Sequence, residues 1–454
     1  MNRRQLILLD KWHKKANRKP LVVQGARQVG KSTLIELFTQ QHKLPLAAVN
    51  LERFFDLTPA FDSNDPRTIL NTLEALPKIG SIQAQSLLFL DEIQAVPEAI
   101  PALRYFYEDM PELAVVCAGS LLEYALRDHH FSMPVGRVEY LHMGPMTFTE
   151  FLDALDEPRL LATINEYAPG QSINPVIHQR LLELLRHYFY VGGMPEAVSV
   201  FGDTRSLQEV SDVHSSIIQT YREDFPKYIG SRSLSRMQHV FNFAARNIGK
   251  KVKYSQFSSD DASVTIKTDL ELLCMARVLS KVVHSHCNGL PLQAETEDKI
   301  YKLLFLDIGL MNAICGLNWR SLTDLSESAL VNEGAIAEQF IGQHLLELLS
   351  GSPNRDLTYW LREGRANNAE LDFVIALNGQ VLPVEVKAGA TGSLKSLHQF
   401  MGEKQLPLAV RFDLNTPSRQ TIRTRIKQGE QVNDIQYELL SLPLYLVERL
   451  PALV

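Results

Sequence analysis

The motif at residues 25–32 constrains the fold of this chain more than any other feature. It reads Gly-Ala-Arg-Gln-Val-Gly-Lys-Ser and matches GxxxxGK(S/T) at every specified position. An apolar run at residues 20–24 precedes it, and a helical pattern follows from Thr33. A strand, a glycine-rich turn and a helix in this order bring backbone N–H groups and a helix N-terminus to one anion. The motif therefore predicts an α/β unit that holds a phosphate group.

The residues of this loop have separate expected roles. Gly25 and Gly30 let the backbone turn its N–H groups onto phosphate oxygens. We expect Lys31 to reach the β- and γ-phosphates of ATP and the Ser32 hydroxyl to ligate Mg²⁺. The expected nucleotide-binding segment comprises Gly25, Ala26, Arg27, Gln28, Val29, Gly30, Lys31, Ser32 and Thr33.

Two acidic residues follow a second apolar strand pattern. The pattern covers Leu87–Leu90, and Asp91 and Glu92 come directly after it. A carboxylate at this place can hold the Mg²⁺ shell, and its neighbour can polarise an attacking water molecule. We expect Asp91 to take the first role and Glu92 the second, catalytic one. An acidic pair that only caps a helix is the simpler alternative.

Two more candidates follow a further strand pattern. Apolar runs at residues 46–51 and 113–118 alternate with helical patterns, which is typical of parallel α/β architecture. Ser120 comes just after the second of these runs and either faces the nucleotide or caps a helix. Arg137 can reach a γ-phosphate in cis or from a neighbouring subunit, or it is an ordinary surface arginine.

These segments together resemble a large group of prokaryotic AAA+ ATPases that carry a C-terminal domain of unknown function related to restriction endonucleases. The resemblance rests on residues 25–32, 90–94, 119–120 and 136–137 and on the Gly-Gly-Met-Pro-Glu-Ala segment at 192–197. It implies ATP and Mg²⁺ as cofactors, a sensor role for Ser120, and a helical lid in which Pro195 packs near the adenine. A plain helix break at Pro195 is the alternative.

The middle of the chain is locally basic. Residues 227–286 contain ten Lys and Arg against four Asp and Glu, a net charge of +6 in a chain whose net charge is −6. A helix ending near Gly249, a strand at 250–253 and a helix at 265–279 resemble a winged helix-turn-helix. Such a module can place its second helix in the major groove while its cations meet phosphates. The sequence thus predicts DNA contact, with a winged helix used only for packing as the alternative.

A second constellation of charged residues lies on a predicted hairpin. Strand patterns at residues 371–377 and 381–386 are joined by a tight Asn378-Gly379 turn. Because side chains alternate along a strand, Glu385 and Lys387 share a face. The hairpin can bring Asp372 to that face.

The three residues follow the pattern D-(x)n-E-x-K of the PD-(D/E)xK nucleases. In that arrangement the two acids, Asp372 and Glu385, hold Mg²⁺, and Lys387 orients or deprotonates water. In that superfamily an earlier helical Glu often completes the metal site, and Glu338 matches best, with Glu333 second. A salt-bridged hairpin without activity is the alternative.

Length and composition fit a folded multidomain protein. The 454 residues contain 45% hydrophobic and 22% charged residues, and no uncharged apolar run approaches the ~20 residues of a membrane span. Four widely spaced cysteines fit a reducing cytoplasm. We expect an α/β multidomain fold with a P-loop AAA+ parallel sheet at 1–155, a helical lid and linker helix at 156–226, a winged helix-turn-helix at 227–320, and a restriction-endonuclease-like α/β domain at 321–454.

The function predicted from these features is an ATP-binding and ATP-hydrolysing protein that engages DNA, with a possible Mg²⁺-dependent nuclease activity. The alternative is an ATP-dependent switch or adaptor whose nuclease-like domain is a non-catalytic scaffold. DNA is the expected partner, a homo-oligomer or an unknown protein partner is possible, and no membrane is expected.

Overall fold

The structure is a computed structural model of the whole chain. It describes residues 3–120, 122, 124, 133–229, 232–317, 333–351, 356–362, 368–389, 393–428 and 431–454. Contacts divide the chain into two compact units, one made of residues 1–144 and 275–278 and the other of 145–274 and 279–454.

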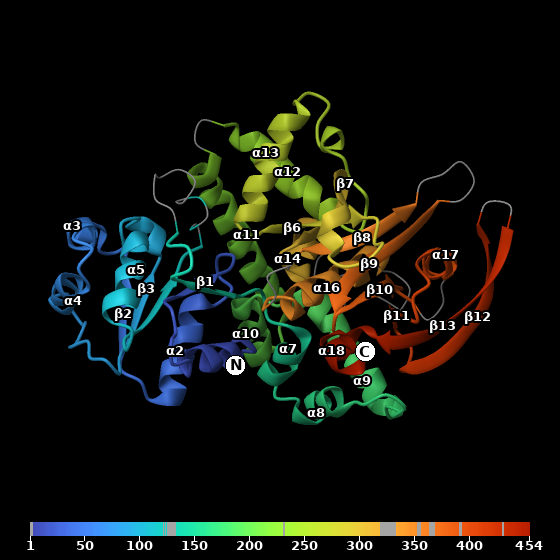
Figure 1. Cartoon of the computed structure of the whole chain (residues 1–454), viewed down its shortest axis with the longest axis horizontal. Coiled ribbons are helices and arrows are strands. Elements are labelled where there is room, and N and C mark those ends of the chain that lie inside the picture. The colour runs from blue at the N-terminus through green and yellow to red at the C-terminus, as the bar shows by residue number, and fades with distance from the viewer. Residues whose placement is uncertain are drawn as a thin grey trace. The chain divides into compact units, whose positions relative to one another are not determined.

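The first unit is built on a five-stranded parallel sheet with the order β2-β3-β4-β1-β5 (Figure 1). Its strands are β1 (Leu21–Gln24), β2 (Leu46–Asn50), β3 (Leu87–Asp91), β4 (Ala114–Ala118) and β5 (Glu139–His142). The four apolar runs of the sequence are confirmed as strands β1 to β4. The fifth strand was not predicted, because only Leu141 in it is buried and its apolar signal is weak.

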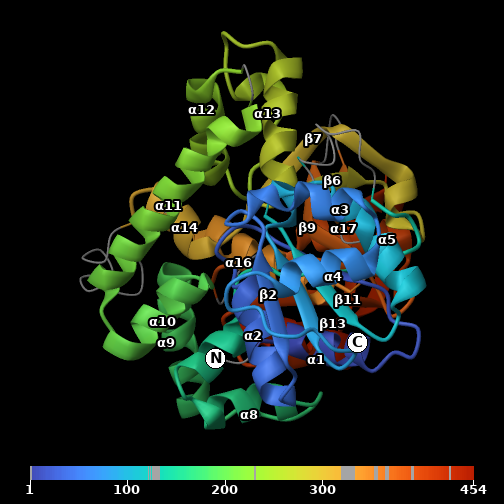
Figure 2. The ribbon, with the colours of Figure 1, turned by 90° about the vertical axis from the view of Figure 1, so that its left-hand side faces the viewer.

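Helices cover this sheet and fill its core. They are α1 (Gln5–His13), α2 (Lys31–His42), α3 (Thr58–Asp62), α4 (Pro66–Glu74) and α5 (Ala99–Asp109), with short 3₁₀ turns η1 (Phe55–Leu57) and η2 (Ile93–Ala95). Helices α3, α4 and α5 pack on one another (Figure 2). One buried cluster joins Leu88 and Leu90 of β3 to Leu103 and Phe106 of α5, and burial of this apolar area stabilises the sheet. The rigid core holds the strand ends that carry the candidate site.

The second unit begins with helices, in agreement with the helical segment expected at 156–226. They are α7 (Phe148–Ala154), α8 (Pro158–Glu166), α9 (Pro175–Val191), α10 (Pro195–Thr204), α11 (Leu207–Ile229), α12 (Leu234–Arg246) and α13 (Ser263–Met275). Helices α12 and α13 lie side by side (Figures 1 and 2), where Arg236 Nε and Asp269 Oδ2 are 2.5 Å apart. This ion pair fixes the two helices to each other.

An eight-stranded mixed sheet forms the rest of this unit. Its order is β12-β13-β11-β10-β9-β8-β6-β7. The strands are β6 (Leu279–Ser285), β7 (Thr296–Phe305), β8 (Leu357–Arg362), β9 (Ala369–Leu377), β10 (Gln380–Val386), β11 (Leu408–Asp413), β12 (Ser418–Gln428) and β13 (Gln431–Pro443). The remaining elements are η3 (Tyr254–Gln256), η4 (Leu292–Glu295), α14 (Ile308–Ile314), α16 (Glu333–Leu348), α17 (Lys395–Lys404), η5 (Leu444–Arg449) and α18 (Leu450–Leu453).

The sheet crosses the domain boundary expected at residue 320. Strands β6 and β7 pair with each other, and β6 pairs in parallel with β8 at Val282–Leu357. Strands β6 and β7, which lie within the range expected for a winged helix-turn-helix, therefore form the edge of this sheet. The strand expected at 250–253 is reduced to a single bridge between Val252 and Tyr301, and α13 ends at Met275, before Arg277 with its φ of 60°.

Two helices pack on this sheet. In α17, Phe400 meets the indole of Trp360 in β8 edge to face, with ring centroids 5.1 Å apart. Helix α16 approaches the sheet closely at Gly342, where an added Cβ would lie 2.6 Å from Leu304 and 3.0 Å from Phe373. The close approach brings the side chains of α16 to those of β7 and β9.

Candidate nucleotide site and acidic cluster

The phosphate loop has the backbone that its glycines require. It leaves β1 after Gln24 and enters α2 at Lys31. Gly30 has a φ of 94°, a left-handed conformation that is strained for residues with a Cβ. A Cβ at Gly25 would lie 2.2 Å from the carbonyl oxygen of Met143, so a larger residue would displace backbone. The loop is therefore built at the carboxyl end of the central strand, where parallel sheets place their ligand sites.

Lys31 is held inside the loop. Its Nζ donates to the carbonyl oxygens of Gly25 at 3.0 Å and Ala26 at 2.8 Å, and the side chain is buried. Burial lowers the pKa of Lys31 to about 8, although the charges of Glu92 and Asp91 oppose this shift. The ammonium thus lies between two carbonyl groups, and a phosphate oxygen can replace these groups as its hydrogen-bond acceptor.

Ser32 and Asp91 meet at the end of the loop. The Ser32 hydroxyl donates to Asp91 Oδ2 at 2.8 Å. Burial raises the pKa of Asp91, and the hydrogen bond from Ser32 opposes the rise. One hydroxyl and one carboxylate that converge at a phosphate loop are oxygen ligands of the kind that Mg²⁺ prefers. The two side chains fit the expected Mg²⁺ site.

The backbone conformation of Glu92 and a hydrogen bond from Gln94 determine where the Glu92 carboxylate lies. Its φ of 52° is left-handed, and Gln94 Nε2 donates to Glu92 Oε2 at 2.6 Å. The Gln94 amide also crowds Gly119 after β4, where a Cβ would lie 2.2 Å from Gln94 Oε1. No separate role for Gln94 was predicted from the sequence. In this structure its hydrogen bond holds the Glu92 carboxylate in place.

Ser120 lies at the same edge of the sheet as Asp91. Strand β4 lies between β3 and β1 and pairs in parallel with β3, up to Leu90 opposite Cys117. Because parallel strands end at the same edge, Ser120 follows β4 where Asp91 ends β3. The placement agrees with the predicted sensor position, and contact with nucleotide remains a prediction.

Arg137 lies at the opposite end of the sheet, which corrects its expected role in cis. Strand β5 pairs with β1 in parallel from Glu139 opposite Leu21, and Arg137 comes just before β5. The phosphate loop leaves β1 at the other end. Arg137 Nε donates instead to Glu108 Oε1 of α5 at 2.8 Å. Only the role toward a neighbouring subunit remains as a prediction.

Pro195 begins a helix in the second unit. It occupies the first turn of α10, where a missing N–H costs nothing. The preceding Gly193 N–H donates to Asp307 Oδ2 at 2.6 Å, and burial raises the pKa of Asp307 to about 6. These contacts show that the Gly-Gly-Met-Pro segment forms a buried connection between α9 and α10. An adenine contact of Pro195 stays a prediction.

The hairpin of β9 and β10 brings the predicted nuclease residues together. The Asn378-Gly379 turn has positive φ at both residues, as a tight hairpin requires. Asp372 Oδ2 accepts a hydrogen bond from the backbone N–H of Val386 at 2.8 Å. Lys387 Nζ donates to Glu385 Oε1.

A lysine that the sequence analysis missed lies among these acids. Lys302 of β7 is 1% exposed, and its Nζ lies 2.9 Å from Glu338 Oε1, 2.7 Å from Glu370 Oε1 and 3.4 Å from Asp372 Oδ1. Burial by itself lowers the pKa of Lys302, but the three carboxylates raise it well above its ordinary value. We call Lys302, Glu338, Glu370, Asp372 and Glu385 the acidic cluster.

The carboxylates of the acidic cluster have unequal environments. Burial raises the pKa of Glu338, and the charge of Asp372 raises it further. Burial and Asp372 also raise the pKa of Glu385, whose Oε2 is buried without a hydrogen-bond partner. The side chain of Glu333, the second choice for a helical ligand, lies outside the described side chains.

The acidic cluster does not have the form of a metal site in this conformation. Within the described ranges, no group of three or more His, Cys, Asp or Glu side chains is arranged to hold a metal ion. The expected ligands Glu338 and Asp372 both face the ammonium of Lys302. The residues are brought together as expected, around a lysine that the sequence did not reveal.

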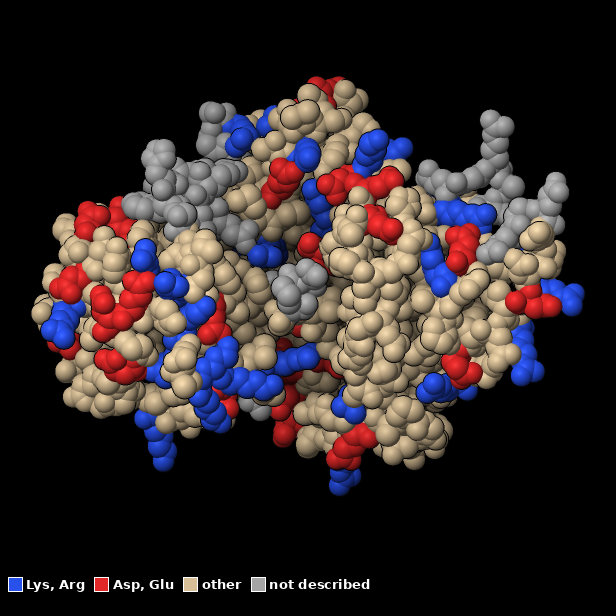
Figure 3. Space-filling model, in the orientation of Figure 1, with Lys and Arg blue, Asp and Glu red and all other residues tan. Residues whose placement is uncertain are grey.

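Several cations of the basic middle segment are paired within the protein. Lys227 lies 3.0 Å from Asp224 and Lys251 lies 3.2 Å from Glu370. Arg246, Lys250 and Lys253 are exposed. Figure 3 shows Lys and Arg interspersed with Asp and Glu over the face drawn. The charge available to a nucleic acid is thus smaller than the sequence count of +6, and Arg246, Lys250 and Lys253 are among the cations that contribute to it.

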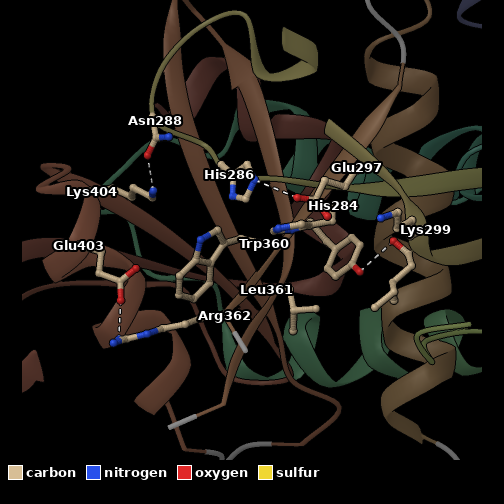
Figure 4. Close-up of a pocket in the computed structure, with 12 residues that line it drawn as sticks. His284, His286, Asn288, Glu297, Lys299, Trp360, Leu361, Arg362, Glu403 and Lys404 are labelled. Carbon is tan, nitrogen blue, oxygen red and sulfur yellow. Dashed lines mark hydrogen bonds and ion pairs between the residues drawn. The ribbon is translucent and has the colours of Figure 1, made fainter. Parts of the chain in front are cut away.

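A pocket of about 460 Å³ lies beside β6, β7, β8 and the end of α17 (Figure 4). Charged side chains of its lining pair with each other, Arg362 with Glu403 at 2.5 Å and His286 with Glu297 at 3.2 Å. These pairs satisfy the charges within the protein, and we assign no ligand to the pocket.

Three protein-family models match separate parts of the chain. The AAA domain matches residues 17–152, a domain of unknown function (DUF8612) matches 182–321, and another domain of unknown function (DUF4143) matches 333–436. A search of curated proteins found no match. Among the described residues, no helix is both long and apolar enough to cross a membrane.

Solved structures resemble the chain only loosely. The Aeropyrum pernix ORC1 protein in complex with DNA has 13% sequence identity and a TM-score of 0.28, over 69% of this chain and 90% of that one. The Aeropyrum pernix ORC2 protein (ADPNP-ADP complexes) has 12% identity and a TM-score of 0.30, over 70% and 92%. The Thermotoga maritima RuvB Holliday junction branch migration motor has 14% identity and a TM-score of 0.26, over 61% and 87%. Scores this low carry no argument about function.

The loop at 25–32, the parallel sheet and the family match agree with one another. Residues 17–152 therefore have the parallel-sheet P-loop fold of an AAA domain.

Proposed function

We propose that this protein binds ATP with Mg²⁺ and hydrolyses it at the loop of residues 25–32. The observation that carries the proposal is the 2.8 Å contact between the Ser32 hydroxyl and Asp91 Oδ2. It joins the first residue after Lys31 to the acid at the end of β3, which are the two positions that hold Mg²⁺ in P-loop proteins.

Each charged group at the loop has a part in this function. Lys31 exchanges its two carbonyl partners for phosphate oxygens, while Ser32 and Asp91 would hold the Mg²⁺ ion. When bound, the ion supplies positive charge that offsets the charge of the phosphates. Glu92, oriented by Gln94, accepts the hydrogen bond of the attacking water and draws its proton.

Nucleotide binding tests the first part of the proposal. Lys31→Ala should abolish binding of a fluorescent ATP analogue, because the phosphates lose their buried cation. Asp91→Asn should reduce the gain in affinity on adding Mg²⁺. Lys11→Ala is a matched control, since Lys11 is exposed on α1 and away from the loop. Equal affinities of Lys31→Ala and wild type would contradict the assigned role.

We further propose that the exposed cations Arg246, Lys250 and Lys253 contact DNA phosphates. Each phosphate contact on duplex DNA contributes about −0.9 to the slope of log K against log salt. Reversing Lys250 and Lys253 to Glu should weaken binding and flatten that slope by about two contacts. Reversing the exposed Lys11 and Lys43 changes net charge equally and should leave the slope in place. An unchanged slope in the variant with Lys250 and Lys253 reversed would indicate that the basic segment serves only for packing.

Divalent-metal-dependent DNA cleavage is a second candidate function. Its support is the order α16-β8-β9-β10-α17-β11 and the meeting of Asp372, Glu385 and Lys387 on one hairpin. We expect Asp372→Asn to abolish any Mn²⁺-dependent nicking of linear, supercoiled or branched DNA in the presence of ATP. Failure of the wild type to cut any of these would favour the adaptor, whose nuclease-like domain is a binding scaffold.

A further inference from the structure

Lys302 lies where the carboxylates of the acidic cluster converge. Its ammonium has three acceptors within 3.4 Å, from Glu338 of α16 and from Glu370 and Asp372 of β9. The side chain crosses the ring of Tyr359, with Nζ 5.6 Å from the ring centroid. An ammonium has three N–H donors, so this lysine can satisfy all three carboxylates at once.

Lys302 lies close to the basic segment at residues 246–253, because that segment pairs with β7. The neighbour of Lys302, Tyr301, bridges to Val252, and Lys251 lies 3.2 Å from Glu370 Oε2. Lys251 and Lys302 thus approach Glu370 from two segments that pair with each other. The acidic cluster is closed by two cations from outside the hairpin that carries the nuclease pattern.

We propose that Lys302 is an internal counter-ion that closes the acidic cluster to divalent metal ions. The inference rests on the second candidate function above, because it concerns the same carboxylates. A metal ion needs the oxygens of Glu338 and Asp372 that now accept from the ammonium. Charge-assisted hydrogen bonds in a buried place are strong, and the cluster gains a metal only when Lys302 leaves. In this conformation the carboxylates of Glu338 and Asp372 are therefore not available to the metal ion that cleavage requires.

The unpartnered Oε2 of Glu385 agrees with this arrangement. It is buried and has no hydrogen-bond partner, although the other oxygen of the same carboxylate pairs with Lys387. An orphaned carboxylate oxygen beside a filled cluster is a ligand atom without its cation. Lys302 contacts three acids and leaves one oxygen of this fourth acid without a partner.

Mn²⁺ binding to the full chain, followed by electron paramagnetic resonance without nucleotide, tests the proposal. Lys302→Met keeps the length and removes the charge. We expect the Asp372-dependent affinity for Mn²⁺ to be at least about tenfold higher in Lys302→Met than in wild type, a change of ~1.4 kcal/mol. The gain should vanish in the double variant with Asp372→Asn. Lys299→Met, on the exposed face of the same strand, is the matched control and should behave as wild type.

The outcomes separate the two proposals. Equal Mn²⁺ affinity in wild type and Lys302→Met would overturn the closure and leave the metal site standing. No binding in any variant would overturn both. Because Lys302→Met leaves buried acids without a cation, Lys302→Met with Glu370→Gln serves if the single variant does not fold, since Glu370 also contacts Lys302 and is not an assigned metal ligand. In that double variant, Mn²⁺ should raise the unfolding temperature, and no rise would refute the closure.

Discussion

Raising the pH should weaken nucleotide binding because Lys31 loses its positive charge. Burial lowers the pKa of Lys31 to about 8, so its ammonium loses its proton within an accessible range. The bound phosphates hold the proton on the amine, because the charged form alone pairs with them. Binding and protonation are therefore linked, and affinity falls as pH rises through this pKa.

The size of the effect follows from the charged fraction of Lys31. With a pKa of about 8, roughly three-quarters of the amine is charged at pH 7.5 and roughly one-tenth at pH 9. The affinity should thus fall about eightfold between these values, or ~1.2 kcal/mol. ADP is a suitable ligand because its terminal phosphate, which ionises near pH 6, keeps the same charge throughout this range.

Calorimetric titration of ADP at pH 7.5, 8, 8.5 and 9 measures this loss. Lys31→Arg is the control, because a guanidinium stays charged at all these values and its profile should be flat even where its affinity is lower. An equally steep profile in Lys31→Arg would place the titrating group elsewhere. A flat wild-type profile would refute the argument that burial holds the amine near neutrality.

Two further predictions concern the fold around the sites. Gly25→Ala should lower the urea midpoint and ADP affinity because its Cβ would lie 2.2 Å from the Met143 carbonyl, whereas Gly80→Ala, with open space, should change neither. His344 accepts from the Phe148 N–H, and burial lowers its pKa to about 4. Because the unfolded chain binds that proton near pH 6.5, this group's contribution to stability falls as pH drops from 6.5 to 4, by ~3 kcal/mol. Urea unfolding of His344→Gln should show a shallower acid loss, and an unchanged one would contradict the assignment.

Local sequence predicted the conformation of three segments correctly because each segment is short and continuous. The loop at 25–32, the strand ending at Asp91 and the turn at Asn378-Gly379 each depend on a few adjacent residues. Their chemistry and backbone geometry follow from residue type, as the positive φ of Gly30 shows.

The positions of Arg137 and Lys302 depend on distant pairing. The residues at 136–137 do not indicate at which end of the sheet they lie. The pairing of β5 with β1 determines that position. Lys302 lies in an ordinary strand sequence, Tyr-Lys-Leu-Leu-Phe, and its partners lie on α16 and β9. A charged residue inside the apolar part of β7 was the one local signal of a buried counter-ion.

Release of inorganic phosphate from ATP by wild type and Glu92→Gln tests the central claim most directly. Both proteins should bind MgATP with similar affinity, because Glu92 lies after the residues assigned to the ion and is not among them. The wild type should turn over, and Glu92→Gln should lose at least about a hundredfold in rate because the water loses its polarising carboxylate. Equal rates of phosphate release, or no release by wild type with and without DNA, would contradict the account.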